Sequence, residues 1–225
     1  MADTLKNKFS TEASANTSEA VSGTVAANEV DTILSLSICN THASTDTTID
    51  LFIDPASGSN SYIYLNQSLP AKSTFVHNSK IILTEGDVLY FQTSAAVNCQ
   101  IVTSYLHQTA VATSSGNDYL DRYLVAQSGG SGGLMEMTPN NTTDVKTVLA
   151  FTVCNQNTST DTTFDVYTRN SSGNSFMVYD DQALPAQSTF EHSDKIILAA
   201  NEELVFDQAG TLDISVVTSF LRQVP

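Results

Sequence analysis

The chain has 225 residues, of which 41% are hydrophobic and 15% are charged, and its formal net charge is −15. This hydrophobic share can bury the cores of two small domains, while the negative charge and the nine scattered Lys and Arg residues argue against nucleic-acid binding. No apolar run reaches the length of a signal peptide or a membrane span, so we expect synthesis in a cytoplasm and no membrane partner.

The first 29 residues are polar and rich in Ala, Ser and Thr, and the stretch 17–20 could at most start a short helix. As free chain such a segment is disordered, because it has too little apolar surface to offset the entropy lost on ordering. We therefore expect residues 1–29 to form an extended N-terminal arm that lies on a neighbouring subunit of an assembly.

Residues 34–106 and 149–221 are two copies of one sequence, aligned without a gap at a constant shift of 115 residues. A repeat of this kind outranks local signals and predicts one fold used twice. We expect one domain over 30–108 and a second over 145–225. The matched runs begin at Cys39 and Cys154, Ser44 and Ser159, Leu69 and Leu184, Ser73 and Ser188, Lys80 and Lys195, and Val102 and Val217.

Within each copy, apolar and polar residues alternate over short segments bounded by Gly, Pro or Asn, without a helical period. This pattern is typical of strands with one buried face. It predicts an all-β fold of two tandem antiparallel β-sandwiches, jelly-roll or immunoglobulin-like, with a closed barrel as the alternative. The predicted inward positions include Leu34, Leu36, Ile38, Ile49, Leu51, Leu89, Phe91, Val97, Cys99, Ile101, Thr103 and Tyr105, with counterparts that include Leu149, Phe164, Val166, Leu212 and Phe220.

Residues 109–144 join the two copies and combine two characters. The Gly/Ser run at 129–133 is typical of a flexible spacer, yet the segment also holds apolar residues that a spacer does not need. We predict a partly ordered linker in which residues 119–125 form a short helix or strand that docks on a domain or on another subunit. The candidate partner contacts in it are Tyr119, Leu120, Tyr123 and Leu124.

Three cysteines leave one without a partner in any pairing scheme. Cys99 corresponds to Ile214, so its position requires an apolar side chain, and Cys39 and Cys154 share one place on the outer edge of a strand. We expect three reduced thiols, which fits assembly inside a cell.

His77 and His192 recur at equivalent positions, each two residues after a Phe that we predict to be buried. A metal or acid–base site would need a carboxylate close by, and Asp46 is a recurring candidate. We favour the structural interpretation, in which the histidine bonds to a turn and Asp46 caps its own backbone. The sequence shows no nucleophile elbow, phosphate-binding loop, zinc spacing or paired carboxylates, so we expect no enzyme, no metal and no cofactor.

Phe52 and Tyr167 are equivalent residues that point away from the face of Ile49 and Leu51, so an aromatic patch is expected on the outside of each copy. Exposed aromatics beside a polar groove are typical of glycan-binding modules. The simpler interpretation is that each patch packs on the linker or at a subunit contact.

At the level of the whole domain, the chain resembles small β-sandwich proteins of tailed-bacteriophage virions, notably phages of marine hosts such as cyanophages. The resemblance rests on the Cys-Asn pair that begins at Cys39, the Thr-Thr-x-Asp run that begins at Thr47, the Leu-Pro-Ala hinge at Leu69, the Lys-Ile-Ile-Leu run and the turn around Gly86. It covers both copies but neither the arm nor the linker, and the second copy departs from it at the turn, where Asn201 stands. Such a resemblance implies an accessory virion component at the head, neck, tail or fibre.

We therefore predict a non-enzymatic structural component of a tailed-phage virion, either a head decoration or a neck or tail accessory protein. It would be made in the host cytoplasm and bind capsid, neck or tail subunits in a symmetric multi-copy assembly. The alternative is a host-receptor or glycan-binding module of a phage fibre or adhesin. If the arm anchors the protein, removing residues 1–28 should leave both domains folded and abolish incorporation into particles.

Overall fold

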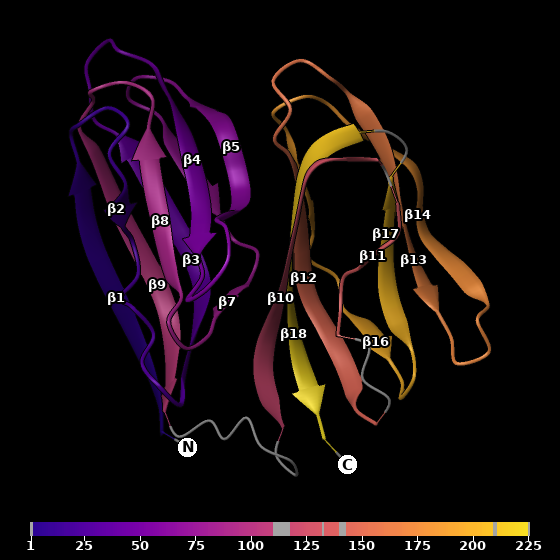
Figure 1. The fold of residues 1–225 in the computed structure, drawn as a ribbon. Coiled ribbons are helices and arrows are strands. Elements are labelled where there is room, and N and C mark those ends of the chain that lie inside the picture. The colour runs from indigo at the N-terminus through magenta and orange to yellow at the C-terminus, as the bar shows by residue number, and fades with distance from the viewer. Residues whose placement is uncertain (1, 110–117, 132, 140–142, 209–210, 225) are drawn as a thin grey trace. The chain divides into compact units, whose positions relative to one another are not determined.

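In the computed structural model the described residues are 2–109, 118–131, 133–139, 143–208 and 211–224. They form strands, turns and loops, and none of them belongs to a helix long and apolar enough to cross a membrane. The chain divides into two compact units, Met1–Val111 and Ala112–Pro225, which Figure 1 shows in indigo to magenta and in rose to yellow.

The first unit is a sandwich of two antiparallel sheets. One sheet has the strand order β1-β9-β3-β6, with β7 also paired to β3, and the other has the order β2-β8-β4-β5. The strands are β1 (Ala2–Glu12), β2 (Glu19–Ala20), β3 (Glu29–Asn40), β4 (Thr47–Asp54), β5 (Ser61–Leu69), β6 (Thr74–His77), β7 (Ile81–Leu83), β8 (Val88–Thr93) and β9 (Cys99–Thr109).

The second unit repeats this arrangement strand for strand. Its sheets have the orders β10-β18-β12-β15, with β16 also paired to β12, and β11-β17-β13-β14. The strands are β10 (Tyr119–Ser131), β11 (Met135–Glu136), β12 (Val145–Asn155), β13 (Thr162–Arg169), β14 (Ser175–Leu184), β15 (Thr189–His192), β16 (Ile196–Leu198), β17 (Glu203–Gln208) and β18 (Thr211–Gln223).

The connections in each unit alternate between the two sheets in the manner of a jelly roll. If β6 and β7 are counted as two pieces of one strand, the chain order 1 to 8 gives sheets 1-8-3-6 and 2-7-4-5. This is the eight-stranded, double Greek-key arrangement. The predicted tandem β-sandwich is therefore confirmed, and the strand order selects the jelly roll over the immunoglobulin-like and closed-barrel alternatives.

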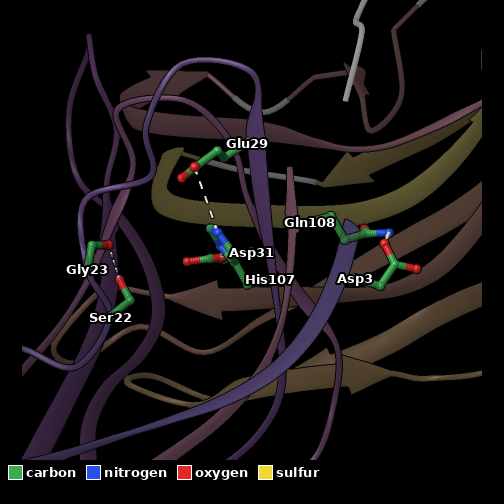
Figure 2. A network of polar contacts seen from close by, with 7 residues as sticks. All are labelled: Asp3, Ser22, Gly23, Glu29, Asp31, His107 and Gln108. Atoms are coloured by element: carbon green, nitrogen blue, oxygen red, sulfur yellow. Dashed lines mark hydrogen bonds and ion pairs between the residues drawn. The ribbon is translucent and has the colours of Figure 1, made fainter. Parts of the chain in front are cut away.

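The duplication extends over the predicted arm and linker, which the sequence comparison had left unmatched. Strand β1 pairs with β9 so that Leu5 lies opposite Leu106, and β10 pairs with β18 so that Leu120 lies opposite Leu221, again at a shift of 115. The same side-chain hydrogen bond also closes the start of both strands: Gln108 donates to Asp3 (3.2 Å, Figure 2), and Gln223 donates to Asp118 (3.5 Å).

The second strands correspond as well, at a shift of 116. Val21 and Met137 are both fully buried. The residue after each of them bonds through its hydroxyl to the neighbouring strand of the same sheet, which is β8 in the first domain and β17 in the second. The Ser22 hydroxyl accepts a hydrogen bond from the Leu89 amide (2.8 Å), and the Thr138 hydroxyl accepts one from the Leu204 amide (3.2 Å). The single extra residue of the second copy lies within or after β10, whose register shifts between Gln127 and Gly130.

The expectation of an N-terminal arm over 1–29 is therefore wrong, and so is that of a linker over 109–144. Both segments supply the first two strands of a jelly roll. The Gly/Ser run at 129–133 is not a spacer in its described part, because β10 continues to Ser131; Gly132 lies outside the described residues. Residues 119–125 do form a strand that docks on a domain, as one of the two alternatives predicted.

Most of the predicted core positions are confirmed. Ile49, Leu51 and their counterparts Phe164 and Val166 are buried. The last strand is buried at alternating positions over 99–103 in the first copy, where Tyr105 is half-buried, and at every position over 214–220 in the second. Leu34 is an exception: a bulge between Ile33 and Ser35 turns Ile33 inward and leaves Leu34 half-buried, and a bulge at the equivalent place does the same to Leu149. The side chain of Leu212 lies outside the described part of the chain.

Candidate functional site

The motifs that recur in both copies build loops. Asn40, which ends β3, is fully buried, and its amide donates to the carbonyls of Thr45 (3.0 Å) and Leu69 (3.3 Å). Asn155 makes the same bonds to Thr160 (2.9 Å) and Leu184 (3.2 Å). The repeated Cys-Asn pair thus marks an asparagine that ties two loops to the end of a strand.

Asp46 belongs to this loop arrangement as well. Its carboxylate accepts a hydrogen bond from the backbone amide of Ala71 (2.9 Å), and Asp161 accepts the equivalent bond from Ala186 (2.9 Å). The predicted cap on its own backbone is therefore wrong in detail, because the loop that carries Asp46 lies beside the Leu-Pro-Ala hinge. One contact explains why both motifs recur together.

The recurring histidines lie in the domain interior, each beside a tyrosine. The hydroxyl of Tyr64 is 2.8 Å from Nδ1 of His77, and that of Tyr179 is 2.8 Å from Nδ1 of His192. The His192 ring also stacks on Phe151 at 4.7 Å between centroids, and burial lowers its pKa below 6.5. Asp46 is exposed whereas His77 is buried, so the alternative site of His77 with Asp46 does not form. Besides its tyrosine, His192 hydrogen-bonds the backbone of Asp194 in the bend that follows its strand, as the structural interpretation predicted.

The three cysteines lie in described strands and form no disulfide with one another. Cys99 and Cys154 are buried, and Cys39 is half-buried. Burial raises the pKa of the Cys99 thiol to about 11, which keeps it protonated and poorly nucleophilic at neutral pH.

The outer aromatic patch is placed differently from the expectation. Phe52 is only 4% exposed, and its ring packs against Tyr62 (5.3 Å between centroids) and Tyr90 (5.8 Å) on the two neighbouring strands. Tyr167 is half-buried opposite Met177 and Val205. The predicted exposure of Phe52 is wrong, because cross-strand aromatic neighbours on its own sheet cover it.

The four candidate contacts on residues 119–125 all lie on β10. Tyr119 is buried, its ring is 5.4 Å from the Arg222 guanidinium, and burial raises the pKa of its hydroxyl. Leu120, Tyr123 and Leu124 are half-buried, and Tyr123 packs against the core of its own domain. Whether these residues also contact a partner subunit remains a prediction.

One cluster of charges differs between the copies although its backbone positions are equivalent. In the first domain His107 lies 2.7 Å from Asp31 and 3.8 Å from Glu29 (Figure 2). The second domain has Lys146, Arg222 and Asp144 at the corresponding positions, with the arginine paired to the aspartate. Two carboxylates with one histidine have become two cations with one carboxylate.

The second domain carries a surface depression of about 220 Å³ that is lined by more carboxylates than the equivalent place in the first domain. Asp165, Asp181 and Asp207 line it, at the places where the first copy has Asp50, Asn66 and Gln92. The described residues form no group of three His, Cys, Asp or Glu side chains arranged to hold a metal ion. Three carboxylates make the depression attractive to cationic groups, and the Asp165 carboxylate accepts a hydrogen bond from the Asp181 amide (2.8 Å).

Four of the eight large apolar side chains that are exposed among the described residues lie on two edge strands, a feature that the sequence analysis missed. Leu5 and Phe9 on β1 are 75% and 70% exposed, and Phe176 and Met177 on β14 are 58% and 51% exposed. Each strand ends its sheet. The available signal on β1 was the spacing of Leu5 and Phe9, which places both on one face of a strand, but the polar composition of residues 1–29 concealed it.

No family model and no curated protein matches the chain. Among solved structures, the STIV MCP is 9% identical over 100% of this chain and 98% of that one, with a TM-score of 0.38. The major capsid protein P2 from bacteriophage PM2 is 7% identical over 98% of both chains, with a TM-score of 0.41. The CBM22-1-CBM22-2 tandem domain of Xyn10C from Paenibacillus barcinonensis is 12% identical over 99% of this chain and 93% of that one, with a TM-score of 0.30. Likeness at this level carries no argument about function.

Proposed function

We propose that the chain is a non-enzymatic structural protein of a virus particle, which acts by assembling in many copies with other virion proteins. The observation that carries the proposal is the tandem duplication of a complete jelly roll, since this architecture serves in viral capsids as well as in lectins and cupins. Two of the solved structures named above are those of virion proteins, and their names agree with the proposal without supporting it further.

The described side chains favour binding over chemistry. The residues that both copies keep are Asn40, Asp46 and Tyr64 with His77, together with their counterparts, and each of them bonds within its own domain. Charged positions diverge, such as the half-buried His107 and Asp207, and so do core positions such as Ile49. Divergence of this kind is expected when two domains face different neighbours, because a shared reaction would hold the polar positions constant.

The finer proposal is a head decoration or a neck or tail accessory protein of a tailed phage, made in the host cytoplasm. Immunogold labelling of purified particles distinguishes these locations, and quantitative mass spectrometry of the same particles gives the copy number. The proposal expects label at one fixed place and a copy number that is a multiple of the local symmetry. Purified infectious particles that lack the chain would contradict it.

A glycan-binding module is the second candidate, and one observation favours it. Tyr62, Phe52 and Tyr90 form a row of rings across β5, β4 and β8 on the outer face of one sheet. The central ring is buried, so the row offers a sugar only its two tyrosines. A glycan array with the purified protein tests this candidate; binding that Tyr62→Ala and Tyr90→Ala remove would favour it, and the structural proposal expects no binding.

A further inference from the structure

The two edge strands with exposed apolar side chains belong to different positions of the jelly roll. Strand β1 ends the first sheet of the first domain, and β14 ends the second sheet of the second domain. Their counterparts in the other copy, β10 and β5, carry none of the strongly exposed large apolar side chains among the residues that the structure describes. Val76 on β6 and Ile197 on β16 are exposed as well, but only β1 and β14 carry two such side chains each, and these two strands are not equivalent.

We propose that β1 of one chain pairs with β14 of a second copy of the same chain, so that copies associate head to tail. The two strands have matching lengths, 11 and 10 residues, and each has a free edge in its sheet. An open edge strand is a template for another strand, and exposed apolar side chains on it mark an interaction site. Leu5 and Phe9 share one face of β1 and would meet Met177, whereas Phe176, the preceding residue, points to the opposite face of β14.

Charge decides between head-to-tail and self-pairing. The middle of β1 carries Lys6 and Lys8, whereas β14 carries Asp180 and Asp181 and no cation. Lys6 and both aspartates are exposed, while half-buried Lys8 donates to the carbonyls of Ala20 (2.6 Å) and Ser22 (2.8 Å) within its own domain. Pairing β1 with β1 or β14 with β14 would place like charges opposite each other, which is unfavourable, whereas β1 with β14 joins opposite charges.

The acidic residues of β1 lie near its two ends, Asp3 at one and buried Glu12 at the other. Gln108 donates a hydrogen bond to Asp3, and the Ala13 amide donates one to Glu12 (2.8 Å); these donors are neutral and do not offset the carboxylate charges. The cationic part of β1 is therefore its middle, where Lys6 is exposed. A head-to-tail contact leaves one free edge of each kind on every dimer, so association continues to a closed ring or a filament. The inference deepens the proposed function, because it names a contact between copies in the assembly.

The test uses the full chain and two variants in sedimentation velocity and native mass spectrometry. Leu5→Ser with Phe9→Ser removes the first edge, and Phe176→Ser with Met177→Ser removes the second. We expect wild type to form oligomers, each variant alone to be monomeric, and a 1:1 mixture to form dimers that contain one chain of each. Ile197→Ser, which removes a 69% exposed side chain from neither edge, is the matched control and should assemble as wild type does.

A monomeric wild type, assembly by either edge variant alone, or a mixture that stays monomeric would overturn the head-to-tail contact. Because the four side chains are exposed, the variants should keep the wild-type circular dichroism and thermal midpoint. A charge exchange provides an independent reading: Lys6→Asp should weaken association several-fold at low salt, and adding Asp180→Lys with Asp181→Lys should restore it. No restoration contradicts the proposed pairing.

The outcome of this experiment can be distinguished from that of the test of the proposed function. Self-association is measured on purified protein, so absence of the chain from particles would refute the virion role and leave the contact between copies standing. Conversely, a chain that is present in particles but monomeric when pure would indicate that another virion protein covers β1, which refutes this inference and leaves the virion role intact.

Discussion

The first and second domains share the same side-chain hydrogen bonds to their loops, but their core side chains and their charged residues differ. Asn40 and Asn155 hold the same loops with bonds of nearly the same length. Ile49, by contrast, has become Phe164, which packs against Phe206 at 5.3 Å between centroids in the second core. The comparison shows that loop-holding amides constrain this fold more tightly than the identity of its core side chains.

The largest expected effect tests whether the two cores are exchangeable. Phe164→Ala should lower the free energy of unfolding of the second domain by about 4 kcal/mol, because it leaves a cavity among packed rings. The matched change Ile49→Phe should lower that of the first domain by about 1–3 kcal/mol through overpacking. Hydrogen exchange in denaturant, followed by mass spectrometry, reads the two domains separately. Neutral outcomes for both would mean that the cores are loosely packed.

A second change should affect both domains alike. Asn40→Ala leaves two carbonyls without their donor, and Asn155→Ala leaves three, so each change should cost its own domain about 2–3 kcal/mol. Asn98→Ala, at an exposed position, is the control and should change stability by less than about 0.5 kcal/mol. A loss confined to one domain would contradict the shared role of the two amides.

The fold class was predictable from sequence because inward positions such as Ile49 and Phe164 are apolar in both copies. The first strand was not. Residues 2–12 are held by backbone hydrogen bonds to β9, which leave little trace in the sequence, and the apolar residues of β1 that alternate, Leu5 and Phe9, point outward. For the removal of residues 1–28 the structure gives the opposite expectation, that the first domain is destabilised, because this change takes away β1 and β2.

The candidate site was predictable only in part. Repetition correctly singled out Asp46 and His77, but their partners Ala71 and Tyr64 are distant in sequence and depend on how loops and strands meet. Phe52 was expected to be exposed because sequence alternation reports which face of a sheet a residue lies on, and not what lies beside it on that face. The exposed edges needed the strand order, which no local pattern contains.

A pH titration should sharpen the comparison at His192. Burial lowers the pKa of this residue in the folded state below its unfolded value of 6.5, so the unfolded state binds more protons as the pH falls through 6.5. The stability of the second domain should be constant above this pH, and should decrease below it until the folded histidine is protonated too. Unfolding curves between pH 8 and 5 measure the effect, and His192→Gln should flatten it; an unchanged slope in the variant would assign the titration to another group.

The smallest expected effect concerns the acidic depression. Asp207→Gln with Asp181→Asn gives the second domain nearly the side chains of the first at these places and removes two like charges near Asp165. The free energy of unfolding should rise by about 0.5 kcal/mol at low salt, and the gain should shrink at high salt because exposed charges are screened. A gain that is independent of salt would mean that repulsion is not its cause.

The central claim is that residues 2–12 and 119–131 are equivalent first strands of two complete jelly rolls. Backbone hydrogen exchange of these two segments, at a concentration where the protein is monomeric, tests it most directly. The structure predicts that amides hydrogen-bonded to β9 and β18 exchange slowly in both segments. Exchange at the rate of an unstructured chain in either segment would contradict the claim. It would instead favour the original expectation of an N-terminal arm over 1–29 or of a linker over 109–144.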